Sequence, residues 1–186
     1  MRLWINDDHP PANYNQKWLF KIIQTKKINM TTITEGIPAP DFTAFDQAGN
    51  TITLSELKGH KIILYFYPKD DTPGCTAEAC SLRDNYSLLK EKGYNIIGVS
   101  PDKATSHHKF IDKYKLPFPL IPDIDKIILN KYGVWGPKKF MGKSYDGVNR
   151  TTFVIDENGI IEKIITKVDT KDHAGQLVRE LGLLST

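Results

Sequence analysis

The sequence predicts an α/β fold, a three-layer sandwich in which helices flank a central mixed β-sheet. Short apolar runs typical of buried strands alternate along the chain with segments whose apolar residues recur at helical spacing. Near the C-terminus, two apolar segments flank Asp156-Glu-Asn-Gly, a strong hairpin signal. Parallel strands from the alternating part and antiparallel strands from the hairpin together make a mixed sheet.

The domain is predicted to begin with a β-hairpin that leads into the central strand. Segments Asp41–Asp46 and Thr51–Leu54 alternate apolar and polar residues around a Gln-Ala-Gly-Asn turn. A short helical turn at Ser55–Gly59 follows. The β-branched and aromatic run Lys61–Tyr67 then predicts a buried central strand.

A long helix is predicted after this strand. Thr72 is a candidate N-cap and Pro73 suits the first helical position. Apolar residues recur at helical spacing as far as Gly93, which should end the helix. These residues are Ala79, Leu82, Tyr86 and Leu89. Tyr94–Ser100 is the next predicted strand.

The second half of the domain is predicted to continue the alternation. Asp102 should cap a helix that carries Ala104, His107, Ile111 and Tyr114 on one face and ends before Pro117. The remaining expected elements are a short strand at Leu120, a helix at Ile124–Tyr132, a long loop at Gly133–Val148, strands at Thr151–Ile155 and Ile160–Ile165, and an amphipathic helix at Asp172–Leu183.

Both cysteines lie where the central strand gives way to the long helix. Cys75 falls at about the third helical position, where backbone N–H groups lack intrahelical partners and the helix dipole is positive. Helix N-termini and neighbouring cations can lower a cysteine pKa from about 8.5 to roughly 3.5–7.5. Cys75 is therefore the candidate nucleophile.

Cys80 lies five residues further along the same predicted helix. In a helix, positions with this spacing have Cα atoms roughly 8–9 Å apart and point about 140° away from each other. A disulfide needs Cα atoms within about 7 Å. A Cys75–Cys80 bridge would therefore require the first turns of the helix to unwind.

The motif Pro68-x-x-x-Thr72-x-x-Cys75 resembles the active-site signature of the peroxiredoxins. The surrounding Tyr-Phe-Tyr-Pro-Lys-Asp-x-Thr-Pro-Gly-Cys-Thr-x-Glu-Ala-Cys is similar to the bacterioferritin comigratory protein (PrxQ) branch in particular. Tyr132-Gly-Val-Trp-Gly and Arg150-Thr-Thr-Phe-Val-Ile-Asp also match, and the similarity runs from about Gly36 to the C-terminus. One departure is Pro137, where relatives usually carry Glu, and we expect only a local loop difference.

The resemblance implies a thioredoxin-like fold and a peroxidase that reduces hydrogen peroxide and organic hydroperoxides without a cofactor or metal. Cys75 would be the peroxidatic cysteine and Cys80 the resolving one. Arg150 would match the catalytic arginine of the family. The Cys75–Cys80 disulfide would then be reduced by thioredoxin or a similar thiol reductant.

In the expected reaction, the Cys75 thiolate attacks a peroxide oxygen and becomes a sulfenic acid. Negative charge develops on the departing oxygen, so donors aimed at it lower the barrier. Arg150 can hold the thiolate and bind the peroxide, and the Thr72 hydroxyl can donate to a peroxide oxygen. Pro68 has no N–H and should shield the thiolate from water.

Two other interpretations use the same cysteines. A non-catalytic redox sensor would be oxidised once and would pass oxidation to a partner. A zinc site could combine Cys75, Cys80, His107 and His108, although this spacing is poor for zinc. Three nearby residues also have ordinary interpretations: Glu78 as a helix-stabilising charge, and Tyr65 and Trp135 as core or pocket wall.

Composition limits the partners and the compartment. The net charge is +3, and residues 1–30 hold five basic and two acidic residues, so the remainder is neutral and nucleic acid is not expected as a partner. No apolar run is long enough for a membrane span. Two cysteines at a helix start suit redox chemistry in the cytoplasm. We expect a monomer, with residues 1–30 as a poorly ordered N-terminal extension and residues 31–186 as the domain.

Met30 precedes the start of the peroxiredoxin-like pattern and is a candidate alternative start. A protein beginning at Met30 should keep full peroxidase activity, because the predicted site residues all follow it. A peroxide-consumption assay on this shortened protein and the full chain measures the difference. A large loss of activity would contradict the expectation.

Overall fold

The structure, a computed structural model, describes residues 33–140 and 142–183 of the 186. The predicted extension, residues 1–30, lies outside the described residues. In the part of the chain that is described, no helix is both long enough and apolar enough to cross a membrane.

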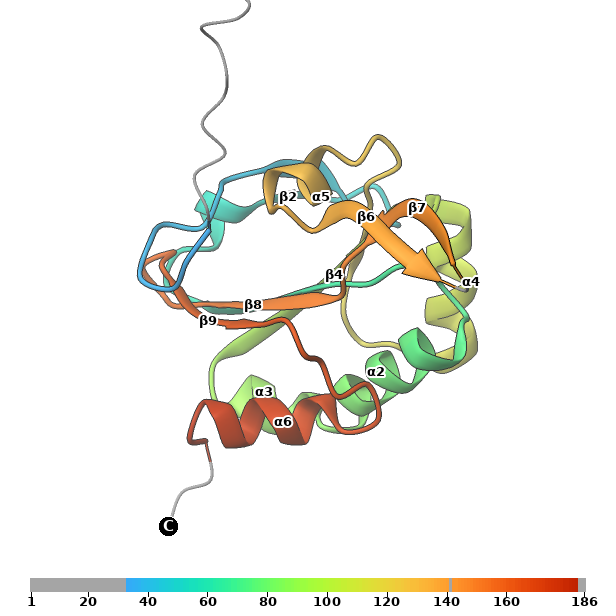
Figure 1. Cartoon of the computed structure of the whole chain (residues 1–186). Helices are drawn as coiled ribbons and strands as arrows, with labels where there is room; N and C mark the ends of the chain where they lie inside the picture. The colour runs from blue at the N-terminus through green and yellow to red at the C-terminus, as the bar shows by residue number, and fades with distance from the viewer. Residues whose placement is uncertain (1–32, 141, 184–186) are drawn as a thin grey trace, which may run out of the picture. The chain divides into compact units, whose positions relative to one another are not determined.

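A central five-stranded sheet has the order β5-β4-β3-β8-β9 (Figure 1). Its strands are β3 (Lys61–Phe66), β4 (Tyr94–Ser100), β5 (Leu120–Pro122), β8 (Thr151–Ile155) and β9 (Ile161–Ile165). Strand β3 pairs in parallel with β4, which pairs in parallel with β5, whereas β8 is antiparallel to both β3 and β9. The sheet is therefore mixed, as predicted.

Helices cover one face of this sheet. They are α2 (Pro73–Asp84), α3 (Tyr86–Glu91), α4 (Ala104–Tyr114) and α6 (His173–Glu180). Ile63, Tyr65 and Tyr67 of the central strand region point into the core on this side, where they share a cluster with Leu82 and Phe110. Successive side chains of a strand point to opposite faces, so alternate residues serve the other layer.

The opposite face is covered by shorter elements. These are the antiparallel hairpin of β1 (Thr43–Phe45) and β2 (Thr51–Thr53), the 3₁₀ helix η1 (Leu54–Leu57) and α5 (Ile127–Lys131). Ile62, Leu64 and Phe66 face this layer and pack with Leu54 and Leu129. A layer of helices on one face of the sheet and a layer of shorter elements on the other confirm the predicted three-layer sandwich (Figure 1).

The predicted long helix from Thr72 to Gly93 is in fact two helices, α2 and α3, separated at Asn85. Asn85 has φ −109° and ψ 13°, and its Nδ2 donates to the Ser81 carbonyl at 3.0 Å. Asparagine side chains compete with the backbone for such hydrogen bonds and so favour helix ends. Gly93, with φ 87°, ends α3 as expected.

Two other helix starts differ from the prediction. Asp102 does not cap α4; the Asp102 Oδ2 atom instead accepts hydrogen bonds from the Asp70 N–H and the Ser100 hydroxyl, both at 2.8 Å. Helix α5 begins at Ile127 rather than Ile124, because the Asp123 carboxylate accepts the N–H groups of Ile127 (2.9 Å) and Leu129 (2.7 Å).

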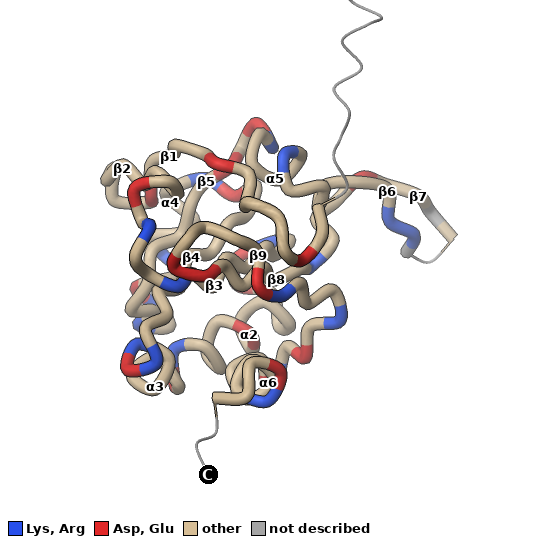
Figure 2. The backbone as a smooth tube through the Cα atoms, turned by 90° about the vertical axis from the view of Figure 1, so that its left-hand side faces the viewer, with Lys and Arg blue, Asp and Glu red and all other residues tan. Residues whose placement is uncertain are grey.

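The prediction of a long loop at Gly133–Val148 is wrong. It is a β-hairpin of β6 (Trp135–Phe140) and β7 (Lys143–Val148), which Figure 2 shows extending from the other described elements. Pro137, the departure from the family pattern, pairs with Asp146 in this hairpin. Many of its residues are exposed, so backbone pairing holds it without the apolar alternation that marks a half-buried strand.

Gly98 in β4 is a position where the fold leaves no room for a side chain. It pairs with Tyr65 of β3 and Leu120 of β5. A Cβ atom at residue 98 would lie 2.5 Å from Leu120 Cδ2 and 2.7 Å from Tyr65 Cζ. Both neighbours are fully buried core residues, so neither can move aside easily.

Gly98→Ala should therefore lower the free energy of unfolding by about 1–3 kcal/mol through overpacking. Gly136→Ala is the matched control, because its nearest neighbour, Asn149 Nδ2, would lie 3.8 Å from the new Cβ. Urea unfolding of both variants measures the difference. Equal stabilities of the two variants would contradict the prediction.

Candidate active site

Cys75 is the third residue of α2 and only 1% exposed. Pro73 occupies the first helical position, as predicted, and Thr72 has the extended backbone of an N-cap residue. The Thr72 side chain does not cap the helix, however. Its hydroxyl donates to the Lys69 carbonyl at 3.0 Å, so it closes the turn before the helix instead.

Arg150 lies between β7 and β8 and reaches the sulfur of Cys75. Its Nη2 donates to Cys75 Sγ at 3.2 Å. A Cβ atom at Gly74 would lie 3.5 Å from the same Nη2, an ordinary van der Waals distance, so the guanidinium lies directly against the first turn of the helix. The structure thus brings together two predicted site residues that are 75 positions apart in the chain.

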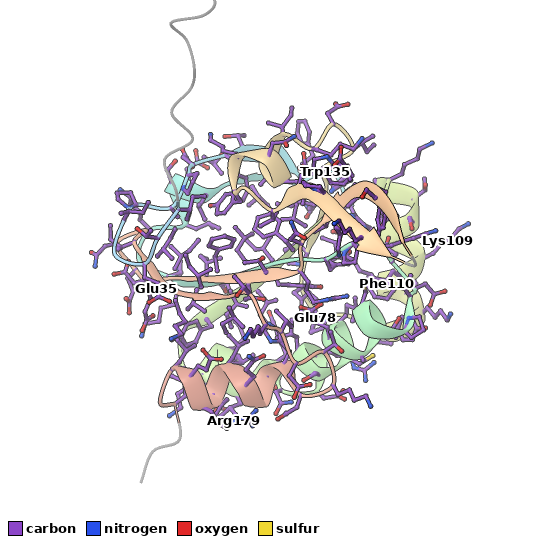
Figure 3. All side chains as sticks on the ribbon, viewed as in Figure 1. Glu35, Glu78, Lys109, Phe110, Trp135 and Arg179 are labelled. Atoms are coloured by element: carbon purple, nitrogen blue, oxygen red, sulfur yellow. The ribbon has the colours of Figure 1, made fainter. Side chains whose placement is uncertain are left out.

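Arg150 is also bound by Glu78, for which the sequence predicted only a helix-stabilising role. The Arg150 Nη1 donates to Glu78 Oε2 in an ion pair, and the Glu78 side chain is 0% exposed. Glu78 lies between α2 and the sheet (Figure 3). Cys75 and Glu78 are three residues apart and so share one face of the helix. That spacing was the signal that could have identified Glu78.

The site concentrates two potential anions around one cation. Burial raises the pKa of Glu78 to about 7, although Arg150 opposes this change. Burial acts to lower the pKa of Arg150, but Glu78 and Cys75 outweigh it and raise that pKa above its ordinary value. Burial and Glu78 raise the pKa of Tyr65 well above its ordinary value, so the Tyr65 hydroxyl stays neutral.

A second buried residue, His173 at the start of α6, lies beside Glu78. The His173 Nε2 is 2.9 Å from Thr152 Oγ1 and 4.0 Å from Glu78 Oε1. Burial lowers the pKa of His173 to about 4, so its ring is neutral at physiological pH. No local sequence signal identifies His173 as a site residue, since nothing in the chain near it connects it to Glu78, 95 residues earlier.

Cys80 and Pro68 are near Cys75 along the chain. Cys80 is half-buried in α2, and both cysteines are free thiols, as expected for an intact helix. Pro68 is half-buried in the turn between β3 and α2. The structure therefore presents a reduced, fully helical state in which Cys75 is paired with Arg150 and not with Cys80.

The turn before α2 is tied to α4. The buried Asp70 carboxylate binds the Tyr67 hydroxyl at 2.7 Å and His107 Nδ1 at 2.9 Å. Asp71, at the strained φ of 54°, binds Lys113 at 2.8 Å. These contacts hold the backbone between Pro68 and Thr72 in place.

The zinc interpretation has no structural support in residues 33–140 and 142–183, where no group of three or more histidine, cysteine or acidic side chains could hold a metal. His107 is buried against Asp70, whereas the neighbouring His108 is exposed. The two imidazoles therefore point to different environments.

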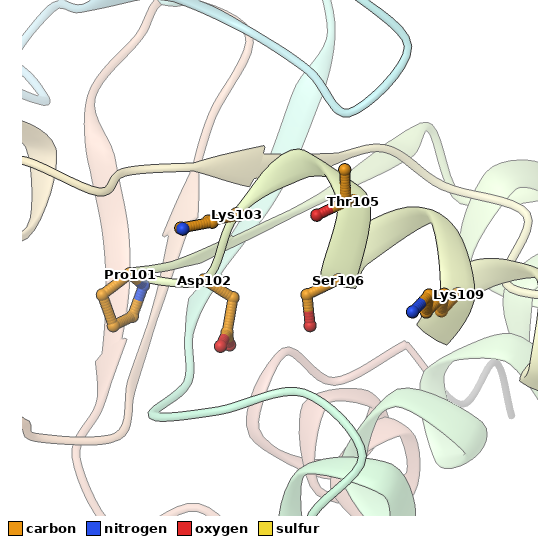
Figure 4. Close-up of a pocket in the computed structure, with 6 residues that line it drawn as sticks. All are labelled: Pro101, Asp102, Lys103, Thr105, Ser106 and Lys109. Carbon is orange, nitrogen blue, oxygen red and sulfur yellow. The ribbon is translucent and has the colours of Figure 1, made fainter.

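A surface pocket of about 430 Å³ lies at the junction of β4 and α4 (Figure 4). Its lining consists of Pro101, Asp102, Lys103, Thr105, Ser106 and Lys109. None of these is a predicted site residue. The Asp102 carboxylate accepts hydrogen bonds from the Asp70 N–H and the Ser100 hydroxyl, so the pocket adjoins the turn before α2, but its lining does not include Cys75, Thr72 or Arg150.

Comparisons with known proteins agree with this geometry. The chain matches the AhpC/TSA family over residues 36–164. It is 45% identical over 150 residues to peroxiredoxin Bcp of Bacillus subtilis, covering 81% of this chain and 96% of that protein. It is 42% identical over 144 residues to peroxiredoxin Bcp of Escherichia coli K12, covering 77% and 92%. The solved structure of Xanthomonas campestris bacterioferritin comigratory protein is similar with a TM-score of 0.71 at 32% identity, over 76% of this chain and 90% of that one.

The raised pKa of Glu78 predicts a pH-dependent effect on stability. The folded protein holds the Glu78 proton more tightly than the unfolded chain, so this contribution is complete below pH 4.5 and is lost as the pH rises through 7. Glu78→Gln lacks it. Between these pH values, the variant should therefore gain up to about 3 kcal/mol in free energy of unfolding relative to the wild type.

Urea unfolding of both proteins at a series of pH values measures this difference. A stability difference that does not change with pH would show that Glu78 is not held as a neutral acid.

Proposed function

The chain belongs to the AhpC/TSA family and is a peroxiredoxin of the Bcp type, a thiol-dependent peroxidase, and from this premise we propose that Cys75 is its peroxidatic cysteine. The observation that carries the proposal is the 3.2 Å contact between Arg150 Nη2 and Cys75 Sγ. A permanently charged guanidinium at this distance stabilises a thiolate, which is the nucleophilic form of cysteine.

The proposed first step transfers one oxygen from the peroxide to Cys75. The thiolate attacks one peroxide oxygen, the O–O bond breaks, and the departing oxygen takes the electron pair and a proton from solvent. The products are a Cys75 sulfenic acid and water or an alcohol. Alkyl peroxide reduction is the activity named for the Xanthomonas campestris relative, and we propose organic hydroperoxides as substrates beside hydrogen peroxide.

Three donors and one shielding residue are proposed to assist this step. Arg150 receives charge as it develops on the departing oxygen. The Thr72 hydroxyl can serve as a second donor if it turns from the Lys69 carbonyl, and the Cys75 N–H lies in the unpaired first turn of α2. Pro68 closes the turn beside the helix start and has no N–H that would attract water.

Cys80 is proposed as the resolving cysteine. Its thiol attacks the Cys75 sulfenic acid, releasing water and forming a disulfide, after the turns between the two residues unwind. The reaction returns to its start when a dithiol reductant such as thioredoxin reduces the disulfide to two thiols. We further propose that the protein works as a monomer in the cytoplasm, a compartment where such a disulfide is transient.

A peroxide-consumption assay coupled to thioredoxin and its reductase tests these roles. Wild type should consume peroxide continuously, and Cys75→Ser should lose turnover by at least a factor of about 10³ because it lacks the nucleophile. Retention of activity in Cys75→Ser would contradict the proposal.

Cys80→Ser separates the resolving role from the peroxidatic one. This variant should complete one oxidation of Cys75 at close to the wild-type rate but should then depend on an added thiol or over-oxidise. Mass spectrometry of the oxidised wild type should find an intramolecular Cys75–Cys80 disulfide. Its absence would exclude Cys80 as the resolving cysteine.

A further inference from the structure

Glu78 lies between Arg150 and His173, and its two carboxyl oxygens differ in their hydrogen bonds. The Oε2 atom accepts a hydrogen bond from Arg150. The Oε1 atom is buried and has no hydrogen-bond partner among the described residues. His173 Nε2 lies 4.0 Å from Oε1. A buried acceptor without a hydrogen-bond partner costs free energy. The protonation of His173 Nε2 therefore affects whether Glu78 is ionised or neutral.

The hydrogen bonds of Gln176 determine which nitrogen of His173 carries the proton. Gln176 Oε1 accepts from the Asp169 N–H at 2.8 Å, while its Nε2 donates to the Lys167 carbonyl at 2.9 Å and to Glu180 at 3.0 Å. Gln176 Oε1 is therefore an acceptor. The His173 Nδ1, 3.3 Å from this oxygen, must be the donor.

A neutral imidazole with its proton on Nδ1 has a lone pair on Nε2. The Thr152 hydroxyl, at 2.9 Å, donates to this lone pair. His173 thus presents an unprotonated nitrogen toward Glu78 Oε1. Thr152 already occupies this lone pair and Oε1 is 4.0 Å away, so Nε2 offers Glu78 no hydrogen bond. The partial negative charge of the unprotonated nitrogen and the missing donor both disfavour a carboxylate at this position.

We propose that His173 is a positioning residue of the peroxidase site, which acts through Glu78 on Arg150 by favouring the neutral form of the Glu78 carboxyl. The proposal rests on the proposed function of Cys75. When Glu78 is neutral, the guanidinium charge of Arg150 is left to the Cys75 sulfur and the peroxide. When Glu78 is ionised, two anions share that one charge.

The fold holds His173 where this role requires it. The Ala174 N–H donates to the Ser81 hydroxyl of α2 at 3.1 Å, which ties the start of α6 to the helix that carries Glu78. His173 is 0% exposed. It also lies beyond residues 36–164, the stretch that matches the family, so the proposed role is separate from the motif that identifies the peroxidase.

The charged and titratable groups around the pair leave Glu78 able to change charge near neutral pH. Glu78 is surrounded by Arg150, Cys75, Tyr65 and His173. His173 is also influenced by Arg150, Glu180 and Asp169. The pKa of Glu78 is about 7, and that of His173 is about 4. At neutral pH the His173 ring is therefore unprotonated, while Glu78 can still hold a proton.

The test is the pH profile of the rate constant for oxidation of Cys75 by hydrogen peroxide. Single-turnover oxidation is followed in a Cys80→Ser background, by trapping the Cys75 sulfenic acid and quantifying it by mass spectrometry. Glu78→Gln should remove one inflection near pH 7, which identifies that inflection as the ionisation of Glu78. A parent profile identical to that of Glu78→Gln would overturn the proposal.

Two variants should move this inflection in opposite directions. His173→Gln can offer an N–H donor to the carboxylate and should lower the midpoint by about 0.5 pH unit or more. Thr152→Val removes the hydroxyl that competes for the His173 lone pair and should raise it. Thr152→Val also keeps the shape of the side chain, so it decides the question if His173→Gln does not fold.

His107→Gln is the matched control, because His107 is an equally buried histidine that binds Asp70 instead of Glu78. Its midpoint should equal that of the parent. Unchanged midpoints in both test variants, shifts in the same direction, or an equal shift in His107→Gln would each overturn the role of His173. Failure of peroxide to oxidise Cys75 in the parent would instead contradict the proposed function.

Discussion

The arrangement of the site depends on one guanidinium group that binds two side chains of the same helix. Arg150 contacts Cys75 Sγ through Nη2 and Glu78 Oε2 through Nη1. Both partners are buried, and an isolated charge in that environment would be costly. The planar, permanently charged fork of arginine can serve two acceptors at once, which a lysine ammonium could not do with the same geometry.

This arrangement links the chemistry of Cys75 to the folding of α2. Glu78 lies between the two cysteines in the chain, so any unwinding that brings Cys80 to Cys75 also moves Glu78. The contact between Glu78 and Arg150 is therefore made only in the helical, reduced state, in which Cys75 also contacts Arg150. In the oxidation that we propose, the Cys75 sulfur becomes an uncharged sulfenic acid, and its contact with Arg150, one of those that keep the first turns of α2 in place, is weakened.

Movement in this region is restricted by the elements on either side of α2. The turn before the helix is bound to α4 through the buried Asp70–His107 pair and the exposed Asp71–Lys113 pair. On the other side, Ser81 is bound to the start of α6. The stretch between these anchors contains both cysteines and Glu78, and it is the stretch that must unwind for the proposed Cys75–Cys80 disulfide to form.

The sequence alone was enough to predict most of the strands and helices and the start of α2, and to propose Cys75 as the reactive cysteine. These features follow from local causes: apolar periodicity, the Pro73 start signal and the motif around Cys75. It also failed where local signals were weak, as in the β6–β7 hairpin, whose exposed faces need no apolar alternation, and at Asp102, whose carboxylate binds Asp70 instead of capping α4. The contact between Arg150 and Cys75, the burial of Glu78 beside them and the position of His173 near Glu78 became evident only from the folded structure. Those contacts join residues far apart in the chain, and they depend on how α2, β8 and α6 pack against one another.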